Sequence, residues 1–326
     1  MTPAHITLNP PVILAPMAGI TDLPWRRVVA GFGAGLVVSE MVASAEVMRD
    51  HPDMRARATL DVTGLDQPSA VQLVGRDPYW MAEAARFVAG QGAKIIDINM
   101  GCPTKRVTSG ACGAALLRDL DLALKLIEAV VGAVDVPVTL KTRLGWDDAS
   151  LNAADLAGRA EQAGIAMVTL HGRTRCQLYK GSANWAAIAA VKEAVSIPVI
   201  ANGDIVDAAT ATEALRQSGA DGVMIGRGAQ GAPWVLAQIA HALHGTPAPK
   251  VPQGADLAAL VCGHYQAMLG FYGVDLGARC ARKHLGWYLQ AAGLGAHREA
   301  LLQAPSPAQV LHLIDRIFTS GERQAA

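Results

Sequence analysis

The chain alternates between short apolar runs and longer amphipathic stretches. Eight of the apolar runs are continuous in hydrophobicity, which is typical of parallel strands covered on both faces. They are VILAPMAG (12–19), GLVVSEMV (35–42), SAVQLVG (69–75), KIIDINMG (94–101), PVTLKTRLG (137–145), MVTLHGR (167–173), PVIANGD (198–204) and GVMIGR (222–227). Alanine-rich amphipathic stretches between them cover residues 79–91, 119–133, 152–163, 184–195 and 207–218. Several end in Gly-Ala or Val-x-x-Pro, which predicts helices that stop before the next strand.

Eight strands alternating with helices predict an α/β fold, a (β/α)8 TIM barrel. A doubly wound open sheet is the competing architecture, but the strand number and the length of the repeating region favour the barrel, for which about 250 residues is typical. The pattern stops after residue 243. We therefore predict a barrel domain over residues 1–243, a linker rich in Pro and Gly over 244–254, and a small all-helical domain over 255–326.

Composition narrows the class of protein. Of 326 residues, 51% are hydrophobic and 17% charged, with a formal net charge of zero, so we expect an ordered protein whose nucleic-acid contacts rely on local basic patches. The odd number of cysteines, five, and their irregular spacing argue against a disulfide framework, and the absence of Cys-x-x-Cys spacing argues against a zinc or iron–sulfur site. We see no signal peptide and no run of membrane-spanning length. We expect a cytoplasmic monomer that binds neither a metal nor a membrane.

Polar and special residues gather where the predicted strands end, which is the face that carries the active site in barrels of this kind. The set comprises Pro16, Met17, Ala18, Gln72, Asn99, Cys102, Lys141, Arg143, His171, Arg173, Asn202, Gly203, Asp204, Gly226 and Arg227. Packing explains such a set poorly, because Lys and Arg are rarely buried unpaired. The alternatives are that Lys141 and Arg143 pair with Glu40 or Asp97 across the barrel mouth, and that His171 is a satisfied structural histidine.

The loops after the last two strands indicate a phosphate site. NGD (202–204) and GRGAQG (226–231) are glycine-bearing turns, and barrels commonly bind phosphate there through backbone N–H groups. Arg227 would add a charge-assisted contact. The glycines also satisfy the dinucleotide pattern G-x-G-x-x-G, but no later strand supplies a ribose-binding acid. We therefore predict a mononucleotide phosphate.

A phosphate cradle together with Lys141 and Gln72 suits a flavin mononucleotide. Gln72 would bond the polar edge of the flavin ring, and Lys141 would stabilise the reduced anion. The residues alone leave open a sugar phosphate, since aldolase-type barrels use a strand-end lysine to form a Schiff base.

Several motifs resemble the tRNA-dihydrouridine synthase family: APMAGITDLPWR, QLVG, DINMGCPTKRV, LKTRLGWDD, HGRTR, VIANGDI and GRGAQGAPW. NMGCP followed by TKRV is most similar to the bacterial B type, and RCARKHLGWYLQ (279–290) resembles the tRNA-binding helical domain of that family. The resemblance implies a barrel that binds FMN, a tRNA-binding tail, and reduction of uridines with NADPH as the electron donor. It implies cofactor contacts from Pro16, Met17, Ala18, Gln72, Lys141, His171, Asn202, Gly203, Asp204, Gly226 and Arg227.

Cys102 is the acid that the resemblance implies. Reduction of the C5–C6 bond of uracil needs a hydride at C6, which reduced flavin delivers, and a proton at C5. A free thiol, with a pKa of ~8.5, is protonated at neutral pH and still able to donate. Asn99 would lie beneath the base, and the small residues TSGACG (108–113) would let the loop close over a flipped nucleotide. An inert buried Cys102 and the nearby Cys112 are the alternatives.

The predicted substrate contacts are Asn99, Lys105, Arg106, Arg173, Arg279, Arg282 and Lys283. Arg279 and Lys283 are i, i+4 neighbours, so a stripe on one helix face would contact phosphates. Trp287 and Tyr288 would stack on bases or form part of the core. The B-type resemblance suggests the uridine at position 17 of the D-loop. Two other functions remain open: a flavin reductase of a free pyrimidine or small enone, and an RNA-binding protein without turnover.

Overall fold

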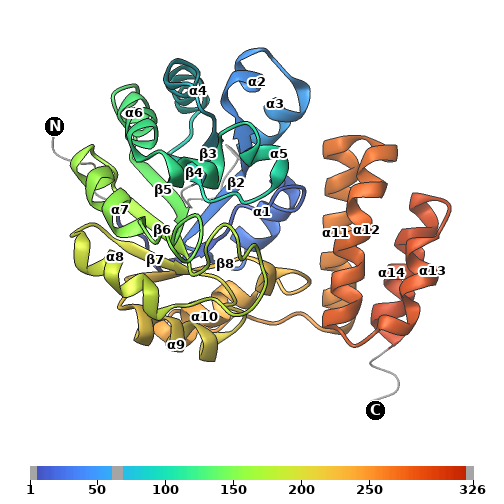
Figure 1. The fold of residues 1–326 in the computed structure, drawn as a ribbon. Coiled ribbons are helices and arrows are strands. Elements are labelled where there is room, and N and C mark those ends of the chain that lie inside the picture. The colour runs from blue at the N-terminus through green and yellow to red at the C-terminus, as the bar shows by residue number, and fades with distance from the viewer. Residues whose placement is uncertain (1–5, 61–68, 321–326) are drawn as a thin grey trace.

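The computed structural model describes residues 6–60 and 69–320, and its main body is a closed barrel of eight parallel strands (Figure 1). The strands are β1 (Val12–Leu14), β2 (Leu36–Ala43), β3 (Ser69–Val74), β4 (Ile95–Met100), β5 (Val138–Arg143), β6 (Met167–His171), β7 (Val199–Asn202) and β8 (Gly222–Ile225). Ile13 pairs with Leu36 on β2 and with Met224 on β8, which closes the ring. The predicted TIM barrel is confirmed, and the open-sheet alternative is wrong.

Helices surround the barrel and separate successive strands: α1 (Leu23–Ala30), α2 (Ser44–Met48), α3 (Pro52–Ala58), α4 (Pro78–Gly90), α5 (Lys105–Thr108), α6 (Leu120–Val131), α7 (Ala153–Gln162), α8 (Ala189–Ala194), α9 (Ala208–Ser218) and α10 (Val235–His244). Local chemistry sets their ends. α9 begins with a capping box between Asp207 and Thr210 and ends at Gly219, whose φ of 64° is left-handed. The predicted amphipathic stretches coincide with α4, α6, α7, α8 and α9.

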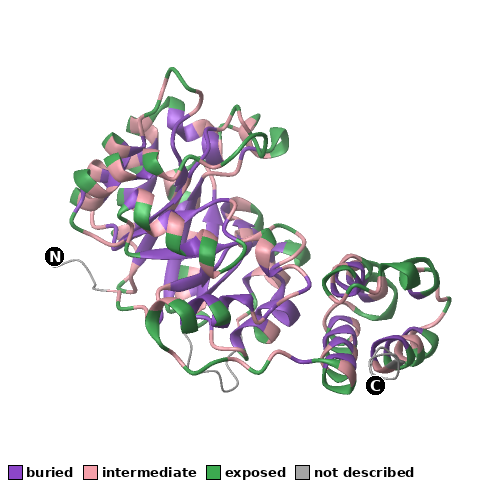
Figure 2. Ribbon diagram, turned by 90° about the horizontal axis from the view of Figure 1, so that it is seen from below, coloured by how far each residue is buried: buried purple, intermediate pink, exposed green. Residues whose placement is uncertain are grey.

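Alternate residues of the strands fill two separate cores. Ile13, Leu36, Ile95, Ile200 and Met224 pack together in one cluster of buried side chains. The intervening residues pack in a second, larger cluster together with the surrounding helices. In Figure 2 the strands are buried, and exposed residues gather on the outer helices. This two-sided burial is why the strands read as continuous apolar runs.

The chain beyond the barrel is helical. After α10 ends at His244, residues 245–253 lead into α11 (Gly254–Tyr272), α12 (Val274–Ala291), α13 (Arg298–Leu302) and α14 (Pro307–Ser320). These helices stand beside the barrel on the side of α1 (Figure 1), and α11 contacts α1 directly. No helix in residues 6–60 and 69–320 is long and apolar enough to span a bilayer.

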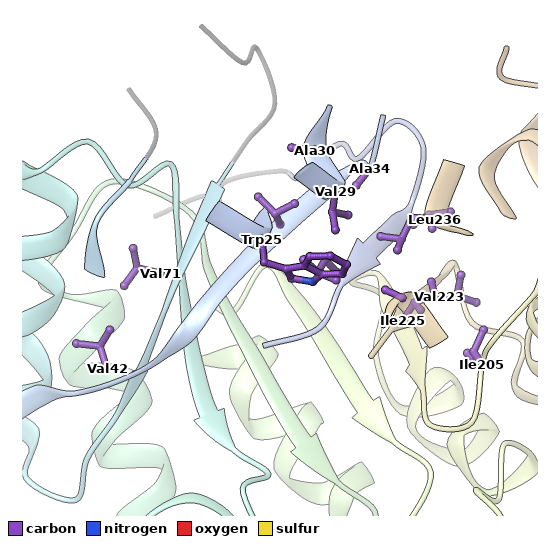
Figure 3. Close-up of a cluster of buried hydrophobic side chains, with 14 of the residues drawn as sticks. Trp25, Val29, Ala30, Ala34, Val42, Val71, Ile205, Val223, Ile225 and Leu236 are labelled. Carbon is purple, nitrogen blue, oxygen red and sulfur yellow. The ribbon is translucent and has the colours of Figure 1, made fainter. Parts of the chain in front are cut away.

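Trp25 joins the two parts of the molecule. It is fully buried in α1 and lies in the cluster shown in Figure 3 with Val29, Ile225 and Leu236. Its ring centroid lies 5.4 Å from that of His264, 5.2 Å from that of His284 and 6.2 Å from that of Tyr288. Tyr288 is therefore a core residue and does not stack on bases. His264 is buried in the same cluster, which lowers its pKa to about 3.

Candidate active site

A cavity of 640 Å³ opens at the ends of the barrel strands. This volume lies in the range usual for sites that bind small molecules or cofactors. Fourteen of the fifteen strand-end residues singled out from the sequence line it: Pro16, Met17, Ala18, Gln72, Asn99, Cys102, Lys141, Arg143, His171, Asn202, Gly203, Asp204, Gly226 and Arg227. The strand-end pattern therefore does mark one continuous cavity.

Three neighbouring strands contribute a buried hydrogen-bond chain beneath the cavity. Gln72, Asp97 and Thr139 are register partners on β3, β4 and β5. The Asp97 carboxylate accepts from Gln72 Nε2 and from Thr139 Oγ1, both at 2.6 Å. Asn99 Nδ2 then donates to Gln72 Oε1 at 2.7 Å. Burial raises the pKa of Asp97 to about 6.

This chain ends at the loop that carries Cys102. Asn99 Oδ1 accepts from the backbone N–H of Gly101 at 3.1 Å and of Cys102 at 2.9 Å. The Cys102 thiol lies 3.3 Å from the Thr104 hydroxyl. The backbone of Gly113 packs closely against Cys102, since a Cβ on Gly113 would lie 2.8 Å from the Cys102 carbonyl oxygen. The thiol lines the cavity and is only half-buried, so the structure does not support the alternative of an inert buried cysteine.

The rival thiol, Cys112, is absent from the cavity lining. Its sulfur donates to the Gly110 carbonyl oxygen at 3.3 Å, and burial raises its pKa. All five cysteines are free. No group of three or more His, Cys, Asp or Glu side chains capable of holding a metal occurs in residues 6–60 and 69–320.

Lys141 is one of the residues that line the cavity. Its ammonium donates to Asn202 Oδ1 at 3.0 Å, and Asn202 in turn donates to the Met224 carbonyl oxygen at 2.8 Å. Burial, and then the neighbouring Arg143, lower the pKa of Lys141 to about 8. Over the described part of the chain, no ion pair joins Lys141 to Glu40 or Asp97, so that alternative is wrong.

Arg143 is buried and binds backbone oxygens. Its guanidinium donates to the carbonyls of Gly101 at 2.8 Å, Thr174 at 2.9 Å and Leu178 at 2.8 Å. These acceptors lie in the loops after β4 and β6. A carboxylate partner for Arg143, the other alternative, is therefore also wrong, and the side chain ties two loops together instead.

His171 is neutral. Burial lowers its pKa to about 2, with a further contribution from the nearby cations, of which Lys141 is the strongest. The Arg173 guanidinium lies 3.3 Å from His171 Nε2. Because a guanidinium can only donate, Nε2 must accept, which places the ring proton on Nδ1.

The loop after β7 is held by Arg173. Asp204 accepts from Arg173 Nη1 at 3.0 Å and Nη2 at 2.5 Å, from the Ala183 backbone N–H at 2.8 Å and from Arg227 at 3.3 Å. Arg173 also donates to the carbonyl of Gly181 at 2.6 Å and is 1% exposed. It does not line the cavity, so its predicted substrate contact finds no support.

The remaining predicted basic residues lie outside the cavity. Lys105 and Arg106 are exposed on α5, directly after Cys102. Arg279 and Arg282 are exposed on α12. Lys283 is half-buried and donates to the Gly19 carbonyl oxygen in the loop after β1. The expected stripe is therefore divided, with Lys283 facing the barrel.

Tyr179 is a lining residue that the sequence analysis missed. It is 53% exposed, and its ring lies 5.4 Å from the guanidinium carbons of both Arg143 and Arg227. It lies four residues after the end of HGRTR (171–175), in a stretch without helical or strand periodicity. An aromatic residue in such a strand-end loop was the available signal.

The family model described as dihydrouridine synthase (Dus) matches residues 13–320. The chain belongs to the dihydrouridine synthase family. A probable tRNA-dihydrouridine synthase of Rhodobacter capsulatus is 62% identical over 322 residues, which cover 98% of each chain. tRNA-dihydrouridine synthase B of Pseudomonas aeruginosa is 49% identical over 284 residues, which cover 87% of this chain and 85% of that protein.

The resemblance read from the motifs is thereby confirmed, and membership of the dihydrouridine synthase family makes the chain an enzyme. Among solved structures, histamine dehydrogenase from Rhizobium sp. 4-9 is similar with a TM-score of 0.53 at 13% identity. That similarity covers 80% of this chain and 50% of the other, and it shows a shared fold.

Proposed function

We propose that this dihydrouridine synthase reduces uridines of tRNA to 5,6-dihydrouridine, with FMN bound in the 640 Å³ cavity and NADPH as the electron donor. The observation that carries the proposal is the placement of Cys102. Its thiol lines the same cavity as Lys141 and the glycine loops after β7 and β8, and Asn99 holds its backbone.

The residues present fit FMN. Gly203, Gly226 and Gly228 offer backbone close to the cavity, and Arg227 adds a positive charge for the phosphate. These loops are tightly packed, since a Cβ on Gly203 would lie 2.9 Å from Ala183 Cβ and one on Gly228 would lie 2.8 Å from the Ile205 carbonyl oxygen. The ring would rest among Met17, Ala18, Gln72 and Lys141, with His171 nearby. When bound and reduced, FMN supplies the hydride for C6 of the uracil.

The protein's own groups supply the proton and the electrostatic stabilisation. Cys102 donates its proton to C5, with the Thr104 hydroxyl, 3.3 Å from the sulfur, orienting the thiol. Lys141, with a pKa of about 8, is largely protonated at neutral pH and stabilises the negative charge that develops in the cavity. Asn99, fixed by Gln72, presents its amide beneath the base.

Access to the cavity requires the target base to leave its stack, because a paired base cannot reach the thiol. Lys105 and Arg106 are exposed one turn beyond Cys102 and would bind the flanking phosphates. Arg279 and Arg282 on α12 would bind phosphates farther along the tRNA. We further propose position 17 of the D-loop as the target and the cytoplasm as the compartment, where tRNA is available. A monomeric state stays a prediction.

The test compares Cys102→Ala with Cys112→Ala as the matched control. We expect Cys102→Ala to bind FMN and tRNA normally but to form dihydrouridine at least about 100-fold more slowly, the usual contribution of a general acid. Cys112→Ala should keep full activity, because that thiol is absent from the cavity lining. Mass spectrometry of the tRNA nucleosides measures the product, and flavin absorption measures loading.

Undiminished turnover in Cys102→Ala would refute the assigned acid. A wild-type protein that takes up no FMN would refute the cofactor. Faster turnover of free uridine than of tRNA would favour a small-molecule reductase.

A further inference from the structure

The helical domain makes a direct contact with the loop that follows β1. The Lys283 ammonium on α12 donates to the Gly19 carbonyl oxygen, and the Gly19 backbone N–H donates to the Glu40 carboxylate. Met17, Ala18 and Ile20, on either side of Gly19, line the cavity. A single side chain of the helical domain therefore reaches the backbone of a cavity-lining loop.

A second contact fixes the other end of the same loop. Tyr272, the last residue of α11, donates its hydroxyl proton to Asp22 Oδ2 at 3.0 Å. Asp22 Oδ1 accepts from the Trp25 backbone N–H at 3.0 Å and so caps α1. Burial raises the pKa of Asp22 to about 6.

A third contact supports the loop after β8. Gly231 has a φ of 78°, and a Cβ there would lie 2.4 Å from the Trp287 carbonyl oxygen on α12. Gly226, Arg227 and Gln230, just before it, line the cavity. Helix α12 thus underlies two loops, and both lie where the flavin would bind.

The charge around Lys283 shows that its role differs from that of the exposed arginines. Asp22 and Glu40 are each 3% exposed, and the positive charge of Lys283 offsets a small part of the rise that burial causes in the pKa of Asp22. Arg279, one turn earlier on the same helix, is exposed. Lys283 therefore bonds the backbone of a loop whose neighbouring carboxylates are buried, which suits holding that loop better than holding a solvent-exposed phosphate.

We propose that Lys283 and Tyr272 are positioning residues for the cofactor cavity. They hold the loop of residues 17–22 in the shape that receives the flavin, so the helical domain sets the affinity of the barrel for FMN. This inference rests on the proposed function. By linkage, flavin binding must in turn stabilise the docking of the helical domain on the barrel.

The test uses full-length protein freed of flavin and titrated with FMN, with quenching of flavin fluorescence as the signal. Lys283→Met should weaken FMN binding about tenfold, which corresponds to about 1.4 kcal/mol. Tyr272→Phe, which removes one hydroxyl, should weaken it by a smaller factor. Lys283→Arg keeps a donor for the Gly19 carbonyl and should restore most of the affinity. Lys250→Met is the matched control, because Lys250 is 84% exposed and pairs with Asp256.

Two further readouts separate positioning from general loss of structure. The visible circular dichroism of bound flavin should change in Lys283→Met, because the loop beside the ring changes shape. It should be that of the wild type in Lys250→Met. If Lys283→Met fails to fold, Tyr272→Phe decides the question.

Wild-type FMN affinity in both Lys283→Met and Tyr272→Phe would overturn the inference. So would a Lys283→Met protein that binds FMN normally and tRNA weakly, because Lys283 would then be a phosphate contact. If the wild-type protein bound no FMN, the proposed function itself would be refuted.

Discussion

Replacing Asp97 tests the hydrogen-bond chain beneath the cavity. Its carboxylate accepts from Gln72 and Thr139, both at 2.6 Å, and it is 3% exposed. Asp97→Ala leaves two buried donors without an acceptor, at about 1–3 kcal/mol each, so we expect a loss of about 2–6 kcal/mol in the free energy of unfolding. In Asp97→Asn the amide oxygen still accepts from Gln72, and the Thr139 hydroxyl can turn to accept from the amide nitrogen. We therefore expect Asp97→Asn to lose less than about 2 kcal/mol.

The same pair of variants gives a pH signature. Folding raises the pKa of Asp97 from 3.8 to about 6, because burial favours the protonated carboxyl. The stability that the folded state gains by binding this proton is complete below pH 4 and is lost as the pH rises through 6. About two pKa units correspond to roughly 3 kcal/mol. Between about pH 4 and 7 the wild type should therefore lose roughly 3 kcal/mol more than Asp97→Asn, which carries no titrating group there. The raised pKa of Asp22 acts equally in both proteins and cancels.

Urea unfolding of the three proteins at several pH values, followed by circular dichroism, measures both effects. Equal stabilities of Asp97→Ala and Asp97→Asn would show that the two hydrogen bonds contribute little. Parallel pH profiles of the wild type and Asp97→Asn would show that Asp97 is not the group with the raised pKa.

Two further substitutions test the ends of the binding surface. Gly203→Ala should weaken FMN binding at least about tenfold, because the φ of Gly203 is 111° and the new Cβ would lie 3.0 Å from the His171 ring. Calorimetric titration with FMN measures the affinity, and an unchanged affinity would argue against a flavin phosphate at this loop. Arg279→Glu combined with Arg282→Glu should weaken tRNA binding and reduce its dependence on salt concentration, while the affinity for FMN stays the same. Filter binding at several salt concentrations measures the tRNA affinity, and an unchanged salt dependence would exclude these arginines from the interface.

Much of the barrel could be predicted because its physics is local. Parallel strands covered on both faces read as unbroken apolar runs, and each of the eight predicted runs overlaps one strand, with β2 ending one residue beyond its run. The first run was predicted to 19 but β1 ends at Leu14, because Pro16 lacks the N–H that a further ladder bond needs. The five-residue α2 and the seven-residue α3 were missed, since neither is long enough to show helical periodicity.

The location of the site was predictable, but its partnerships were not. The strand-end rule brings Lys141 and Cys102 to one cavity without any knowledge of contacts. Which side chain meets which depends on strand register. Asp97 was considered as an ion-pair partner for Lys141, yet register places Gln72 and Thr139 beside it on the neighbouring strands. The division of the basic stripe on α12 likewise depends on how α12 packs against the barrel. The spacing of residues along one helix cannot predict that packing.

Arg143 has a consequence for attempts to redesign this enzyme. Its guanidinium binds the carbonyls of Gly101, Thr174 and Leu178, so the loop with Cys102 and the loop with Tyr179 share one anchor. A lysine offers a single point of attachment and could not replace that planar fork. If either loop alone were replaced by that of a relative, the Arg143 guanidinium would lose part of its carbonyl acceptors. The two loops therefore have to be exchanged together, along with the arginine that binds both.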